Sequence, residues 1–122
     1  MSHRPAEPLV HHELCFGCGR ANLFGLLAEL EPAGEGRVRG RCFVKQDHQG
    51  APPGTAHAGI LAAALAEAIS LAAGSERQLH GLELSFDAPV QVGTFVELDA
   101  SADAATATAE GRPVASARAV WG

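Results

Sequence analysis

The sequence predicts an α+β protein in which one long helix is covered by a curved antiparallel sheet. Residues 58–73 are rich in alanine and apolar nearly all the way round a helical wheel, which is typical of a buried helix. Two segments before this helix and three or four after it have the length and alternation of strands. The later segments are joined by short connections, which favours antiparallel pairing.

The length of 122 residues is that of one domain. Residues 1–14 are predicted to form an N-terminal arm, and residues 15–122 a single domain. The net charge of −5 argues against nucleic acid or an anionic membrane surface as a main partner. No apolar run reaches the roughly 20 residues of a membrane span. Three cysteines, an odd number, predict a reduced, cytoplasmic protein.

The region before the helix is predicted to contain two strands. The first begins near residues 26–30 and ends at Pro32, and Gly34-Glu-Gly36 is a turn signal. The second covers residues 37–44, where three arginines alternate with small or apolar residues, as in a half-buried strand. Residues 45–56 contain two glycines and two prolines and are predicted to be a loop.

The helix is predicted over residues 58–73, because alanine is the best helix former and Gly74 stands where a C-terminal stop belongs. A connection is expected at residues 89–93 and a turn at residues 111–113. Alternating or apolar segments predict the remaining strands, at residues 82–86, 96–100, 105–110 and 114–121.

Seven short stretches occur in an order that is informative as a set: Cys15-Phe-Gly-Cys-Gly19, Asn22-Leu-Phe-Gly-Leu26, Gln49-Gly50, Gly54-Thr-Ala-His-Ala-Gly-Ile60, Leu65-Ala-Glu-Ala68, Leu84-Ser-Phe-Asp-Ala-Pro89 and Val92-Gly93. In this set the sequence resembles the hot-dog-fold thioesterases of the phenylacetate-pathway and 4-hydroxybenzoyl-CoA branch. The resemblance covers residues 15–121. It implies a central helix wrapped by a sheet, a homodimer or homotetramer, and hydrolysis of acyl-CoA thioesters without a metal or an organic cofactor.

The resemblance places the reactive carbonyl group at the start of the helix. Early N–H groups of a helix lack intrahelical partners and carry a partial positive charge, so they stabilise a developing oxyanion. Gly59 is implied to bring its N–H close to the acyl oxygen, and His57 to cap the helix or orient the substrate. The same resemblance implies that the substrate is bound by Gln49, Gly54, Ala58 and Ala66. For Gln49 the alternative is a side chain of a solvated polar loop.

One expected catalytic group is absent. Members of this branch usually carry an acid nine residues after the histidine, where this sequence has Ala66. The next residue, Glu67, is the predicted base. It lies about 12 Å along the helix axis from Gly59 and about 80° around it, so it has to act from a partner subunit. Two alternatives are a non-catalytic protein that binds acyl-CoA or another hydrophobic ligand, and an oligomer-forming protein without a ligand.

Two further clusters carry alternative interpretations. His11, His12, Cys15 and Cys18 offer four metal-binding side chains within eight residues, but Cys-x-x-Cys is only half of a zinc site. Adjacent histidines do not easily converge on one ion with both thiolates, so no metal is predicted and zinc is the alternative. The arginines of residues 37–41 are either CoA phosphate ligands or a solvated strand face.

Overall fold

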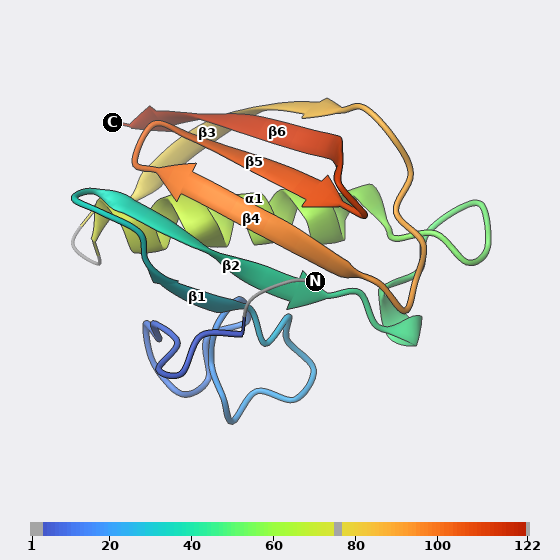
Figure 1. The fold of residues 1–122 in the computed structure, drawn as a ribbon, viewed down its shortest axis with the longest axis horizontal. Coiled ribbons are helices and arrows are strands. Elements are labelled where there is room, and N and C mark those ends of the chain that lie inside the picture. Colours follow the sequence, from blue (N-terminus) through green and yellow to red (C-terminus); the bar gives the residue numbers. More distant parts are fainter. Residues whose placement is uncertain (1–3, 75–76, 122) are drawn as a thin grey trace.

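The computed structural model describes residues 4–74 and 77–121. In these ranges one long helix packs against one face of a six-stranded antiparallel sheet (Figure 1). Chain order gives the elements as β1 (Glu29–Pro32), β2 (Arg37–Phe43), the 3-10 turn η1 (Gln46–His48), α1 (Ala58–Ala73), β3 (Leu79–Phe86), β4 (Phe95–Ser101), β5 (Ala104–Ala109) and β6 (Arg112–Trp121). The predicted α+β architecture is confirmed.

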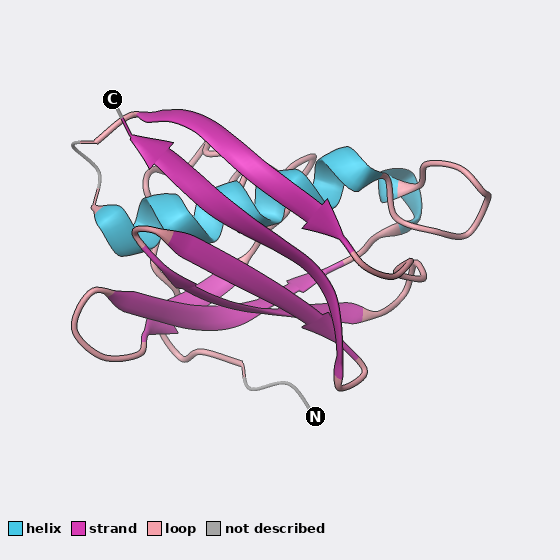
Figure 2. Ribbon diagram, turned by 90° about the horizontal axis from the view of Figure 1, so that it is seen from above, coloured by secondary structure: helices cyan, strands magenta, loops and turns pink. Residues whose placement is uncertain are grey.

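Helix α1 has the predicted bounds. His57 caps its N-terminus, and Gly74 ends it with a φ of +91°, a conformation that glycine adopts without a steric penalty. The helix lies across the concave face of the sheet (Figure 2). Five of its side chains are buried there: Leu61, Ala64, Leu65, Ala68 and Ile69. The opposite side of the helix is left to small, partly exposed residues.

The strand order is β1-β2-β4-β5-β6-β3. Strands β4, β5 and β6 follow one another in space as in sequence, as their short connections predict. Strand β3 does not pair with β4, although the two are consecutive in the chain. It pairs with β6 at one end of the sheet, and residues 87–94 cross over to reach β4 in the middle. This connection is therefore a crossover and not a hairpin turn.

Two predicted boundaries are shifted by local backbone geometry. The first strand begins at Glu29 and not near residue 26, because Leu27 has a φ of +51°, which interrupts an extended chain. The last turn is formed by Glu110 and Gly111, both with positive φ, so Pro113 lies inside β6 and not in the turn.

The segment before β1 packs against the domain. The Leu9 N–H donates to the Leu30 carbonyl at 2.7 Å, and the side chain of Cys18 is completely buried. Cys15–Gly19 forms one helical turn closed by a hydrogen bond from the Gly19 N–H to the Cys15 carbonyl, at 2.9 Å. Across residues 4–74 and 77–121, no helix combines the length and apolar character needed to cross a bilayer.

Candidate functional site

A cavity of about 340 Å³ opens beside the N-terminus of α1. The helix contributes Ala58 and Leu61, the loop before it contributes Pro52, and the end of β3 contributes Phe86. These side chains are apolar, while the first residues of the helix are exposed. The arrangement suits a ligand whose apolar part lies in the cavity and whose polar end meets the partial positive charge of the helix N-terminus.

The backbone N–H of Gly59 is held by a side chain. His57 Nδ1 accepts its hydrogen bond at 2.8 Å, and this bond is the N-cap of α1. A Cβ at Gly59 would meet only the His57 ring, 3.0 Å from Nδ1. An acyl oxygen that reaches the Gly59 N–H therefore has to take the place of His57 Nδ1, which lies on an exposed residue.

Gln49 and Gly54 lie together in the loop before the helix. Gln49 Oε1 accepts from the Gly54 N–H at 2.7 Å, and Gln49 Nε2 donates to the Gln46 carbonyl at 2.9 Å. Both polar ends of the Gln49 side chain are thus used to shape the loop. Gly50 brings this loop close to the helix cap, because a Cβ there would lie 2.7 Å from His57 Cα.

The cavity also contains a carboxyl group that the sequence analysis did not select. Among the described residues that line it, Asp87 is the one ionisable residue. Its Oδ1 accepts a hydrogen bond from Ser85 Oγ at 3.1 Å. The signal in the sequence was the position of Asp87 between a strand and a proline, inside one of the stretches that carry the resemblance. That signal is weak, because an exposed aspartate after an alternating strand is more often a solubilising residue.

Ala66 and Glu67 point in different directions from α1. Ala66 lies on the partly exposed side that also carries Gly59, about 20° away around the axis. Glu67 points into the same subunit, toward the N-terminal segment, and its side chain is only 10% exposed. The role of Glu67 as a base supplied to a partner subunit therefore stays a prediction, and its carboxylate already has partners.

These partners form a compact cluster of His11, Cys15, Cys18 and Glu67, hereafter the four-residue cluster. Its potential ligand atoms all lie within 4.8 Å of one another. His11 Nδ1 is 2.9 Å from Glu67 Oε2, and Cys15 Sγ is 3.7 Å from both carboxylate oxygens. The two sulfurs lie 3.6 and 3.5 Å from His11 Nδ1, for Cys15 and Cys18 respectively.

Packing and backbone contacts hold this cluster in place. The backbone N–H of His11 donates to Cys18 Sγ at 3.1 Å. Gly17 lies directly over Glu67, where a Cβ would come within 2.3 Å of the carboxylate. Burial, with the neighbouring Glu67 carboxylate, raises the pKa of the Cys18 thiol. His12, the adjacent histidine, is exposed and takes no part in the cluster.

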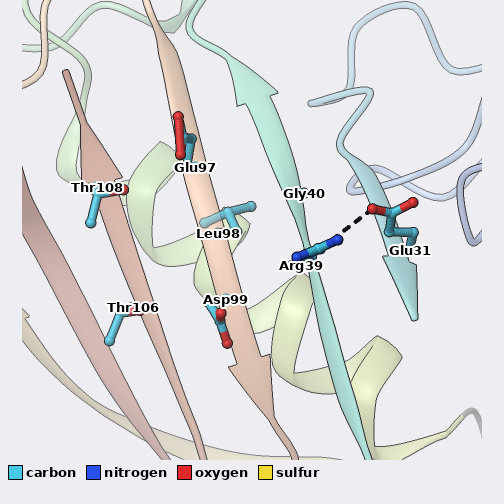
Figure 3. Close-up of a pocket in the computed structure, with 8 residues that line it drawn as sticks. All are labelled: Glu31, Arg39, Gly40, Glu97, Leu98, Asp99, Thr106 and Thr108. Carbon is cyan, nitrogen blue, oxygen red and sulfur yellow. Dashed lines mark hydrogen bonds and ion pairs between the residues drawn. The ribbon is translucent and has the colours of Figure 1, made fainter. Parts of the chain in front are cut away.

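The arginines of β2 are engaged by acids. Arg39 pairs with Glu31 at 3.4 Å, Arg41 pairs with Glu29 at 3.1 Å, and Arg37 pairs with Asp99 of β4. Figure 3 shows Arg39 and Glu31 at the edge of a depression of about 560 Å³ on the outer face of the sheet. Because each guanidinium already has a carboxylate, the structure favours ion pairs across the strands over a phosphate site.

Solved structures with a similar fold agree with this architecture. A thioesterase superfamily protein superimposes with a TM-score of 0.75 at 23% identity, over 85% of this chain and 60% of the other. The present chain therefore spans less than two thirds of that protein.

The names of two further proteins with a similar fold refer to phenylacetic acid degradation. The E. coli PaaI protein from the phenylacetic acid degradation operon has a TM-score of 0.69 at 16% identity, over 77% of this chain and 81% of the other. A phenylacetic acid degradation-related protein from Ralstonia eutropha has a TM-score of 0.67 at 19% identity, over 77% and 83%.

At these identities the likeness shows the fold: the chain has the hot-dog fold of thioesterase superfamily proteins. No protein-family model matches the sequence, and no curated protein matches it either.

Proposed function

We propose that the protein is a cytoplasmic acyl-CoA thioesterase that acts on a small or medium acyl or aroyl group as a homodimer or homotetramer. The single observation that carries this proposal is the apolar cavity at an exposed helix N-terminus. In it a thioester carbonyl can approach oriented N–H groups while its acyl chain packs against apolar side chains. The hot-dog fold, shared with thioesterase superfamily proteins, supports the same substrate class.

The first chemical step is binding of the carbonyl oxygen. In the free protein the Gly59 N–H donates to His57 Nδ1, so the site already holds a hydrogen-bond acceptor where the oxyanion is to form. We expect the thioester oxygen to displace the His57 ring, which then lies beside the substrate. The N–H donates more strongly as negative charge develops on this oxygen, which lowers the barrier to attack.

The second step needs a group that activates water. Ala66 supplies none, and the two candidates are Glu67 of a partner subunit and Asp87 in the cavity itself. Glu67 has to leave His11 and Cys15 to act, whereas Asp87 already lines the cavity. Comparing Glu67→Gln with Asp87→Asn assigns the step, because each removes one carboxylate and keeps its shape.

Release of free CoA thiol from a panel of aliphatic and aromatic acyl-CoAs tests the proposal. Turnover by the wild type and its loss in one of the two amide variants are expected. Full kcat in both variants would remove both carboxylates from the mechanism. An absence of turnover with every thioester would overturn the hydrolase proposal.

A second candidate function is favoured by the missing acid at Ala66 and the engaged carboxylate of Glu67. The same cavity then binds an acyl-CoA or another hydrophobic ligand without hydrolysis. Such a ligand raises Tm because it binds the native state only. A rise in Tm with acyl-CoA and no thiol release would support this function over the first.

A further inference from the structure

The four-residue cluster brings together donors that are far apart in the sequence. His11, Cys15 and Cys18 come from the N-terminal segment, and Glu67 comes from the middle of α1. Cys-x-x-Cys supplies two donors from one helical turn, and the second pair comes from elsewhere, as structural zinc sites require. The sequence offers both His11 and His12 beside the two cysteines, and the fold brings His11 and Glu67 to them.

The sulfur–nitrogen and sulfur–oxygen distances are close to those of a tetrahedral metal site. With Zn–S bonds of about 2.3 Å and Zn–N bonds of about 2.05 Å, tetrahedral angles place sulfur and nitrogen about 3.5–3.6 Å apart. The two observed separations from His11 Nδ1 are 3.6 and 3.5 Å. The sulfur of Cys15 and the carboxylate oxygens are 3.7 Å apart, against about 3.5–3.6 Å expected from the same bond lengths. His11 Nδ1 and Glu67 Oε2 are in direct contact at 2.9 Å, and on a shared ion they would separate to about 3.4 Å.

The surroundings are shaped for the Glu67 carboxylate. It is nine-tenths buried, and the absent side chain of Gly17 leaves the space that it fills. A buried carboxylate beside two thiols needs a compensating positive charge. None of the four cluster residues is a lysine or an arginine that would supply a permanent positive charge. A divalent cation supplies that charge to all four donors at once and stabilises thiolates.

We propose that His11, Cys15, Cys18 and Glu67 bind a divalent transition-metal ion, with Zn²⁺ as the expected occupant. Two sulfurs, one imidazole nitrogen and one carboxylate oxygen are a donor set that zinc accepts and that Mg²⁺ and Ca²⁺ disfavour. Four protein ligands leave no open position, so the site is structural. It fastens the N-terminal segment to α1.

The site has a consequence for the proposed reaction. A carboxylate that coordinates a metal ion is no longer a free base, so the metal-loaded protein cannot also use Glu67 to activate water. Asp87 is then the remaining carboxylate candidate. Metal content is measured without substrate, so this proposal and the proposed function fail or succeed independently.

The test is metal content together with cobalt spectroscopy. The full chain is purified without chelators, its metal content is measured by mass spectrometry, and the apoprotein is titrated with Co²⁺ and then with Zn²⁺. Wild-type protein is expected to bind about one ion per chain. The Co²⁺ form is expected to show thiolate-to-cobalt charge-transfer absorption and the intense visible bands of a tetrahedral site.

Matched variants locate the site. Cys15→Ser and His11→Ala are expected to lower the apparent affinity by more than about tenfold, since even the loss of a hydrogen-bond partner of a metal ligand costs this much. Cys42→Ser and His12→Ala are the controls, because these residues are the same types outside the cluster. Glu67→Gln is expected to alter the cobalt spectrum.

Each result decides the proposal. A wild-type protein that binds no Co²⁺ or Zn²⁺ would overturn it, whatever the variants do. Equal affinity of wild type, Cys15→Ser and His11→Ala would overturn it as well. If a cluster variant fails to fold, the wild-type stoichiometry and tetrahedral spectrum still stand as the test. A Tm that a chelator lowers in the wild type but not in the cluster variants would support a structural role.

Discussion

Gly59 and His57 form a hydrogen-bonded pair at the start of α1. The Gly59 N–H donates to the His57 ring, and both residues are exposed. A capped N–H stabilises the helix in the free protein, and the same N–H is available to a ligand that replaces the ring. The free-state cap and the proposed oxyanion donor are therefore two uses of one backbone group.

Substituting Gly59 by alanine separates these uses. The Cβ would lie 3.0 Å from His57 Nδ1, in the path that an acyl oxygen has to take. We expect Gly59→Ala to lower kcat/KM for acyl-CoA by tenfold or more. Tm should stay equal or rise, because alanine favours a helix over glycine by about 1 kcal/mol. Unchanged kcat/KM would show that the carbonyl does not approach here.

Ala66 offers a gain-of-function experiment. It lies on the same side of α1 as Gly59, on a partly exposed surface that admits a carboxylate. Ala66→Asp should raise thiol release from acyl-CoA, since it installs the acid that related enzymes are implied to carry. Ala62→Asp, one turn earlier, is the matched control. Equal rates for the two variants would show that position 66 does not face a reacting thioester.

His48 makes stability depend on pH. Its ring is buried, Nδ1 accepts from the Lys45 N–H at 3.0 Å, and Nε2 is without a hydrogen-bond partner in the described structure. Burial, reinforced by the nearby Lys45, lowers the pKa of His48 below its ordinary value. The unfolded chain therefore binds a proton more readily, so the free energy of unfolding should fall as pH drops below about 6.5.

Urea denaturation between pH 5 and pH 7.5 measures this effect. His48→Asn keeps an acceptor for the Lys45 N–H but does not titrate, so its stability should vary less over this range. His12→Ala, which removes an exposed histidine, is the control and should retain the wild-type slope. If His48→Asn keeps the full slope, the protons are taken up at another residue.

At the scale of the elements, β3 offers a surface for association with a second copy of the chain. It pairs with β6 on one side, and its other side is an edge of the sheet. Leu84 and Phe86 on this strand are 39% and 47% exposed. An apolar edge strand is a ready surface for pairing with a second copy of the chain. The partly exposed side of α1, made of small residues, allows two helices to approach closely.

Leu84→Lys is expected to weaken the proposed homodimer. A charge at an apolar edge opposes pairing there, so the variant should sediment as a smaller species than the wild type at the same concentration. Leu23→Lys is the matched control, because Leu23 is also exposed but lies in the N-terminal segment. A wild-type protein that is monomeric at every concentration would contradict association through β3.

At the scale of the whole molecule, the crossover after β3 and the packing of the N-terminal segment decide which side chains meet. The crossover brings Asp87 into the cavity beside α1. The N-terminal segment brings two thiols and an imidazole to Glu67, about 50 residues away in sequence. Neither contact follows from the periodicity of any one element.

The sequence alone determined what is local. Helix α1 was predicted at its observed bounds, because helix propensity, a capping position and a terminal glycine are properties of adjacent residues. The alternation of β2, the pairing of β4 with β5 and the pairing of β5 with β6 followed in the same way. The resemblance placed Gly59 and His57 together, and the structure shows how they are bonded.

Only the tertiary structure decided which distant groups meet. Helix geometry showed that Glu67 cannot reach Gly59 within one subunit, but it could not show that Glu67 faces His11, Cys15 and Cys18. The sequence also gave no reason to choose His11 over His12 as the partner of the two cysteines. The physical cause is that such contacts are set by how whole segments pack, and one sequence pattern is compatible with several packings.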